Sequence, residues 1–194
     1  VQGPGQGGQL TFMFTQSGQT LGNAYSASVS LGDLDGDGDL DAFVANYLGP
    51  NIIYFNNGQG TFSDSGQPLG NRDSFDVALD DLDNDGDLDA WVANYNAPNS
   101  VWLNDGLGVF TDSGQSLGNN RTNAISLGDL DGDGDVDGWA ANGLGEPDAI
   151  WLNLGDGRFA HSGQSLGSSF SYGVDLGDLD GDGDLDAWVA NEDE

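Results

Sequence analysis

Short apolar runs alternate with loops rich in glycine and aspartate, and the same order of runs returns about every 48 residues. In each unit one run leads into an acidic loop, and a second run follows the loop. A third run comes after an asparagine and a proline-containing turn, and a fourth carries a phenylalanine. The runs are rich in Val, Ile and aromatic residues and are too short for helices, so the pattern predicts β-strands.

Four short strands in about 48 residues are the length of one blade of a β-propeller. The strand after each acidic loop is expected at Ala42–Ala45, Ala90–Ala93, Trp139–Ala141 and Ala187–Ala190. The next strand is expected at Ile52–Phe55, Val101–Leu103 and Ile150–Leu152. The large aromatic residues in these runs recur in phase with the loops, and we expect them to form the core between blades: Phe43, Trp91, Trp139 and Trp188.

The predicted fold is therefore all-β, a β-propeller-type repeat domain of four blades that spans residues 1–194. The units cover about 24–71, 72–119, 120–168 and 169–194, and the last unit is incomplete. Residues 10–22 align with a fourth strand and are expected to complete a blade. The third strand of the last unit is missing, so the sequence leaves open whether the ring closes within one chain, takes a neighbour's strand, or belongs to a longer array. The apolar segment Gln9–Phe14 would be the donor strand.

The acidic loops carry the candidate chemistry. Acids fall at positions 1, 3, 5, 7 and 9 of each loop, and position 6 is glycine, which permits the sharp turn that brings alternate carboxylates together. The candidate metal ligands are Asp33, Asp35, Asp37, Asp39 and Asp41; Asp81, Asp83, Asp85, Asp87 and Asp89; Asp129, Asp131, Asp133, Asp135 and Asp137; and Asp178, Asp180, Asp182, Asp184 and Asp186.

The ligand type favours calcium. Carboxylate and backbone oxygens are what Ca²⁺ prefers, and no histidine or cysteine lies near the loops to favour a transition metal. An EF-hand is excluded because position 12 is apolar, for example Val44 and Val92, where that motif needs a bidentate Glu. We therefore expect about four Ca²⁺ per chain and a fold that depends on them.

The pattern Asp-x-Asp-x-Asp-Gly-x-x-Asp, entered from one strand and left into an apolar strand, resembles the FG-GAP/VCBS repeat of integrin α-subunit propellers and of many bacterial extracellular proteins. The resemblance covers residues 10–191. It implies structural calcium sites between the first two strands of each blade, with position 7 binding through its carbonyl. The runs Val44–Asn46 and Val92–Asn94 stand where the integrin motif has Gly-Ala-Pro, so the chain is more similar to the bacterial branch.

The composition excludes several classes of function. The chain has 33 acidic residues against three arginines and a net charge of −30, which excludes nucleic-acid binding through phosphate contacts. It has no Cys, no apolar run long enough for membrane insertion and no signal-peptide pattern at residues 1–9. Weak calcium sites would stay mostly empty in cytosol, which favours an extracellular location.

The expected function is a calcium-stabilised structural or adhesion module that assembles with itself or with another surface protein, in a filament or surface array joined by strand complementation. The alternative is a lectin-like propeller that binds glycans at the turns Asn46–Tyr47, Asn94–Asn96 and Asn119–Asn120. An enzyme is not expected, because no catalytic constellation is arranged around His161, the single histidine, and every plausible carboxylate pair lies inside an acidic loop. Asn120-Arg-Thr122 matches the N-glycosylation sequon, a match that is common by chance.

Overall fold

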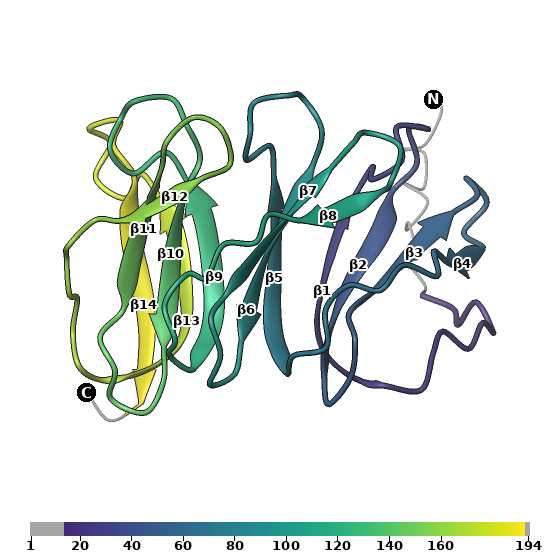
Figure 1. Cartoon of the computed structure of the whole chain (residues 1–194), viewed down its shortest axis with the longest axis horizontal. Coiled ribbons are helices and arrows are strands. Elements are labelled where there is room, and N and C mark those ends of the chain that lie inside the picture. The colour runs from purple at the N-terminus through teal and green to yellow at the C-terminus, as the bar shows by residue number, and fades with distance from the viewer. Residues whose placement is uncertain (1–13, 193–194) are drawn as a thin grey trace, which may run out of the picture.

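The computed structural model describes residues 14–192, and strands make up all of its regular secondary structure within that range. Three antiparallel four-stranded sheets and one two-stranded sheet follow one another along the chain and stand side by side in a row (Figure 1). The predictions of an all-β fold and of repeated four-stranded units are confirmed. The sheets form an open row within the described residues, so the ring whose closure the sequence left open does not close there, and the fourth unit has two strands, as its incomplete sequence predicts.

The strands follow the chain order within each sheet. The first sheet comprises β1 (Tyr25–Gly32), β2 (Asp41–Tyr47), β3 (Ile52–Asn56) and β4 (Phe62–Asp64). The second comprises β5 (Ser74–Asp80), β6 (Asp89–Asn94), β7 (Ser100–Asn104) and β8 (Phe110–Asp112). The third comprises β9 (Thr122–Gly128), β10 (Asp137–Asn142), β11 (Ala149–Asn153) and β12 (Phe159–His161), and the fourth β13 (Phe170–Gly177) and β14 (Asp186–Glu192).

The second strand of each full sheet lies in the middle and is buried on both faces, which explains why its sequence is a continuous apolar run. Trp91 on β6 is fully buried and packs edge-to-face against Phe159 of the next sheet, with ring centroids 4.5 Å apart. Phe43 on β2 is also fully buried and meets Phe110 in the same way at 5.7 Å. The expected aromatic core between sheets is confirmed at these two junctions.

The last member of that aromatic series differs from the expectation. Trp188 on β14 is 72% exposed, because no later sheet packs on it within the part of the chain that the structure describes. The N-terminal segment also differs: residues 14–22 form no strand, and residues 9–13 lie outside the described range. Gln19 in this segment nevertheless contacts the first sheet, since its Nε2 donates to the Gly60 carbonyl at 2.6 Å and its Oε1 accepts from the Phe62 N–H at 2.8 Å.

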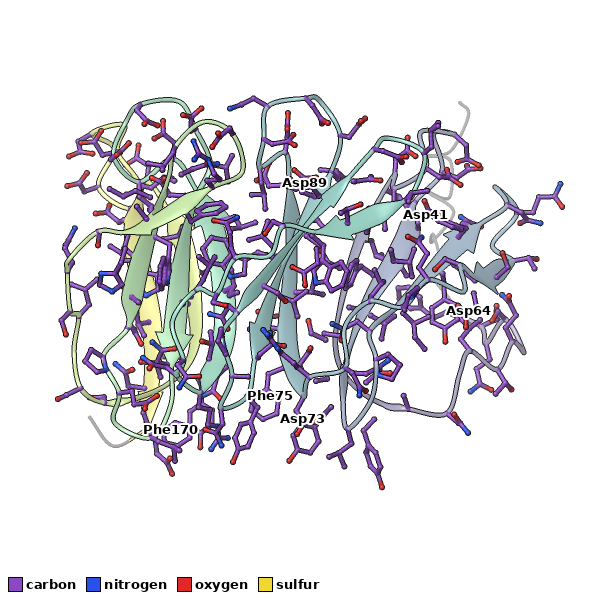
Figure 2. All side chains as sticks on the ribbon, in the orientation of Figure 1. Asp41, Asp64, Asp73, Phe75, Asp89 and Phe170 are labelled. Carbon is purple, nitrogen blue, oxygen red and sulfur yellow. The ribbon has the colours of Figure 1, made fainter. Side chains whose placement is uncertain are left out.

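The two ends of the strands differ in their chemistry. Figure 2 shows Asp41 and Asp89 toward one end of the strands and Asp73, Phe75 and Phe170 at the opposite end. At the end with Phe75 and Phe170, the guanidinium of Arg121 lies over three rings that belong to the second and fourth sheets. Its Cζ is 5.4 Å from the ring centroid of Phe75, 5.0 Å from that of Tyr95 and 5.0 Å from that of Phe170. These cation–π contacts tie the second, third and fourth sheets together.

Candidate metal centre and sheet junctions

Each acidic loop joins the first strand of a sheet to the second, and its first carboxylate organises the turn. In the first loop Asp33 accepts the N–H of Gly36 at 2.9 Å and the N–H of Gly38 at 3.0 Å, one with each oxygen. Gly38 has φ 91°, a left-handed conformation that side chains rarely adopt. The glycine at position 6 is therefore required by the backbone that curls around the carboxylates, as the sequence predicts.

The curled backbone gathers three carboxylates in every loop. One oxygen of each lies within 4.8 Å of the others in the groups Asp33, Asp35 and Asp37; Asp81, Asp83 and Asp85; Asp129, Asp131 and Asp137; and Asp178, Asp180 and Asp186. Such a group could hold a hard divalent cation, since Ca²⁺ takes oxygen ligands at about 2.3–2.6 Å. Which of the predicted residues bind an ion stays a prediction.

The acid at position 9 has a second role that the spacing did not reveal. Asp89 is fully buried, and its two oxygens accept the backbone N–H of Leu82 at 2.9 Å and of Asn104 at 2.8 Å. Asp41 and Asp137 are placed in the same way, each bonded to its own loop and to the end of the third strand. Position 9 therefore pins the acidic loop to the middle of the sheet.

Burial perturbs these carboxyl groups. Removal from water raises the pKa of Asp89 to about 7, against the opposing effect of its two N–H donors. The same cause raises the pKa of Asp137, and burial together with neighbouring carboxylates raises that of Asp35 and Asp83. A bound cation would favour the ionised form of each group. The stability that an ion adds would therefore be greatest in the loops whose carboxylates are least hydrated.

One atom of the second loop tests whether a cation fits. Oδ1 of Asp83 is buried and has no hydrogen-bond partner, which is costly for a carboxylate oxygen. A cation among Asp81, Asp83 and Asp85 would satisfy that oxygen, so the donor set suits a hard metal ion. The side chains at position 7 point elsewhere: a Cβ added at Gly58 or Gly106 would collide with the carboxylate of Asp39 or Asp87.

A glutamine in the Ser-Gly-Gln-x-Leu-Gly motif bridges consecutive sheets, a role that the sequence did not show. Gln67 donates to the Gly108 carbonyl and accepts from the Phe110 N–H at 2.9 Å. Gln115 repeats both contacts one sheet later, at 2.7 Å with Gly157 and 2.8 Å with Phe159. The only signal in the sequence is the fixed phase of this glutamine relative to the acidic loops.

Asparagines at the ends of the third strands add a second bridge. Nδ2 of Asn104 donates to the Leu34 carbonyl in the preceding acidic loop at 2.9 Å, and Nδ2 of Asn153 donates to the Leu82 carbonyl at 2.8 Å. The first and second acidic loops are therefore each held partly by the sheet that follows. This couples the geometry of a candidate metal loop to the packing of two sheets.

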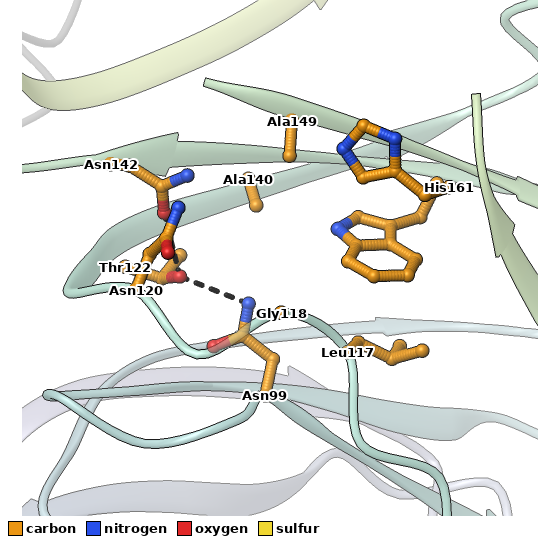
Figure 3. Close-up of a pocket in the computed structure, with 10 residues that line it drawn as sticks. Asn99, Leu117, Gly118, Asn120, Thr122, Ala140, Asn142, Ala149 and His161 are labelled. Carbon is orange, nitrogen blue, oxygen red and sulfur yellow. Dashed lines mark hydrogen bonds between the residues drawn. The ribbon is translucent and has the colours of Figure 1, made fainter. Parts of the chain in front are cut away.

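Small pockets lie where one sheet meets the linker of the next. The pocket in Figure 3 has a volume of about 200 Å³ and is lined by residues that include Asn120, Trp151 and His161. In the figure Asn99, Asn120 and Thr122 lie on one side and His161 on the other. A corresponding pocket at the preceding junction holds Asn71, Trp102 and Asp112, and Nε1 of the buried Trp102 has no hydrogen-bond partner.

Two of the turn residues expected to bind glycans are buried. Asn46 and Asn94 are 1% exposed, and their amides bond to the turn carbonyls of Pro50 and Pro98. Their side chains therefore stabilise the turn and are not available to a sugar. His161 lies on β12 opposite Trp151, and the centroids of their rings are 5.1 Å apart. Nδ1 of His161 accepts the Gly163 N–H at 2.9 Å.

Within residues 14–192 no helix is long and apolar enough to cross a membrane. No curated protein matches the chain. Among solved structures, the crystal structure of the V. cholerae biofilm matrix protein Bap1 is similar, with a TM-score of 0.52 and 22% identity over 84% of this chain. This chain spans 23% of the Bap1 chain, so the similarity supports the fold alone.

A family model described as the FG-GAP-like repeat matches residues 33–92, 81–140 and 129–189. Each match begins at the first aspartate of one acidic loop and ends in the strand that follows the next loop. The three matches together cover most of the chain, and the chain therefore belongs to the FG-GAP-like repeat family.

Proposed function

We propose that the protein is a calcium-stabilised, extracellular structural or adhesion module without catalytic activity. The observation that carries the proposal is the gathering of three carboxylates in each of the four acidic loops, with a buried, unpartnered oxygen on Asp83. Bap1, whose fold is similar, is a biofilm matrix protein, and we propose a structural role of the same kind outside the cell for this chain. About four Ca²⁺ would rigidify the loops and thereby the junctions that Asn104 and Asn153 form with them.

Thermal unfolding tests this proposal. An ion at 100 times its dissociation constant adds about 2.7 kcal/mol per site. For a domain of this size that corresponds to a rise in Tm of about 5–11 °C per site. We expect a higher Tm in millimolar calcium than in excess chelator, and a smaller rise for Asp83→Asn, which keeps the shape of a ligand and removes its charge. A Tm that chelator leaves unchanged in the wild-type protein would refute calcium stabilisation.

The proposed partner is a second copy or another surface protein. Within the described residues β14 pairs with β13 alone, whereas β10 pairs on both sides, so β14 offers a free edge to an added strand. Strand complementation at this edge would join subunits into a filament or array. The expected donor Gln9–Phe14 lies outside the described residues except for Phe14, which is fully exposed.

A second candidate function is glycan binding at the sheet junctions. Each pocket combines the ring of a tryptophan, Trp151 or Trp102, with polar side chains, the combination that sugar-binding sites use. A glycan array in calcium tests this candidate. We expect any binding to fall in Asn120→Ala and His161→Ala and to be unchanged in Leu144→Ala, which lies outside the pocket. An array without signal would rule the candidate out.

A further inference from the structure

The second acidic loop differs from the other three at position 4. That position is glycine in the first, third and fourth loops and asparagine, Asn84, in the second. The backbone of Asn84 is left-handed, with φ 63°, as it is at the corresponding glycines, for example Gly36 at 76° and Gly132 at 80°. Asparagine tolerates this conformation better than most residues. The second loop therefore carries a side chain at a point where the other loops have none.

The side chain of Asn84 reaches the next acidic loop. Its Nδ2 donates to Oδ1 of Asp135 at 2.8 Å, across 51 residues of sequence. Asp135 stands at position 7 of the third loop, where the backbone carbonyl is the expected calcium ligand. The N–H of Asp135 donates to Asp133 of the same loop at 2.9 Å. Asn84 thus holds, from the second loop, a residue that would bind an ion in the third.

A second contact joins the same two loops, and it has a counterpart between the first and the second. Nδ2 of Asn153 donates to the carbonyls of Leu82, in the second loop, at 2.8 Å and of Val136, in the third loop, at 3.0 Å. Nδ2 of Asn104 makes the corresponding pair of contacts one sheet earlier. Of these two pairs of loops, the second and third have the Asn84 bridge in addition.

The residue before Asn84 has fewer contacts than its counterparts in the neighbouring loops. Oδ1 of Asp83 is buried and has no hydrogen-bond partner. The corresponding oxygens of Asp35 and Asp131 each accept the N–H of the residue two places later, at 3.2 Å. Ligation of an ion by Asp83 would therefore order the segment of the second loop that carries Asn84.

We propose that Asn84 is a positioning residue that couples the second acidic loop to the third, so that calcium bound in either loop raises the calcium affinity of the other. The inference rests on the proposed calcium stabilisation and adds a regulation of it. A loop that is ordered through Asn84 and Asp135 loses less conformational entropy when it binds its own ion. The coupling is reciprocal, because one free energy is shared between the two sites. One hydrogen bond corresponds to a change in affinity of about 2- to 10-fold.

Asn84→Gly tests the coupling, because it gives the second loop the glycine that the other three loops have at position 4. A calcium titration followed by NMR resolves the loops, since the N–H groups of Gly38, Gly86 and Gly134 each donate to the first carboxylate of their own loop at 3.0 Å. Asn96→Gly is the matched control: Asn96 is exposed, has φ 49° and lies in the turn between β6 and β7, away from the acidic loops. Salt at about 0.15 M screens the general repulsion between loops. Circular dichroism establishes that each variant is folded.

We expect Asn84→Gly to raise the calcium midpoints at Gly86 and Gly134 by about 2- to 10-fold and the midpoint at Gly38 by less. Asn96→Gly should change none of them. Asp135→Ala removes the acceptor and keeps the backbone carbonyl, so it should raise the midpoint at Gly86, in the other loop, by a similar factor. Asn84→Gly should add no further rise at Gly86 when Asp135 is already replaced.

The inference is overturned if Asn84→Gly leaves the midpoint at Gly134 unchanged, if Asp135→Ala leaves that at Gly86 unchanged, or if the midpoint at Gly38 rises as much as the other two. Additive effects of the two substitutions at Gly86 would also overturn it. Loops that titrate with calcium without this coupling, in a protein whose Tm rises with calcium, leave the proposed calcium stabilisation standing. Loops that do not titrate and a Tm that chelator leaves unchanged contradict the proposed function itself.

Discussion

The buried acid at position 9 should stabilise the fold even without a metal ion. Asp89→Ala removes the acceptor of two backbone N–H groups, those of Leu82 and Asn104, in a region where the aspartate is 0% exposed. A buried donor left without a partner costs about 1–3 kcal/mol. We therefore expect the free energy of unfolding to fall by about 2–6 kcal/mol in calcium-free solution.

Asp85→Ala is the matched control from the same loop. Asp85 is exposed and its carboxylate accepts one hydrogen bond, from the Asp87 N–H at 3.0 Å. Its loss should cost no more than about 0.5 kcal/mol without calcium. Both variants should lose part of the calcium-dependent stabilisation, because both remove a candidate ligand. The two effects of Asp89 therefore separate when the metal is absent.

The assay is urea unfolding followed by tryptophan fluorescence and circular dichroism, in calcium-free solution at about pH 6, where Asp89, with a pKa of about 7, does not bear the cost of a buried charge. Equal m-values for the wild type and the variants would show that the midpoints report stability. If Asp89→Ala and Asp85→Ala matched the wild type without calcium and differed from it only in calcium, position 9 would act through the metal alone. That result would refute the structural role that we assign to its two hydrogen bonds.

Three further predictions concern the junctions and pH. Trp91→Ala should lower the free energy of unfolding by about 3–5 kcal/mol because it empties a fully buried site, whereas Trp188→Ala should lower it by less than about 0.5 kcal/mol. Urea unfolding at low protein concentration compares the two variants. Equal losses of stability would contradict the exposed placement of Trp188. Gln115→Leu breaks two contacts between the second and third sheets and should lower Tm and speed amide exchange there, whereas Gln164→Leu, at an exposed position, should do neither. Because burial raises the pKa of Asp89 from its ordinary value of 3.8 to about 7, the folded chain binds an extra proton between these values. The contribution of Asp89 to the stability of the calcium-free protein should therefore be greatest in acid and be lost as pH rises through about 7. A series of melting curves on calcium-free protein from about pH 5 to pH 8 checks the sign, and a Tm that rises over this interval would be the wrong outcome.

The repeat made much of the fold predictable. Strand chemistry with four runs per unit predicts the four-stranded sheets, and the bounds of the third strands agree within a residue or two. The spacing of acids around Gly38 predicts the curled loop, because alternate carboxylates can converge only if position 6 adopts a left-handed conformation. These features depend on residues close together in the chain, where sequence pattern and local geometry are tightly linked.

The sequence therefore determined the strands, the acidic loops and the aromatic positions that recur in phase with them. The tertiary structure alone decided which of those positions are buried, since Trp91 and Trp188 occupy equivalent places in the repeat and differ from 0% to 72% in exposure. It also decided that Gln67, Asn104 and Asp89 join one element to another. Burial and bridging depend on whether a neighbouring sheet is present, and that is a contact between distant segments that the periodicity of a single unit does not encode.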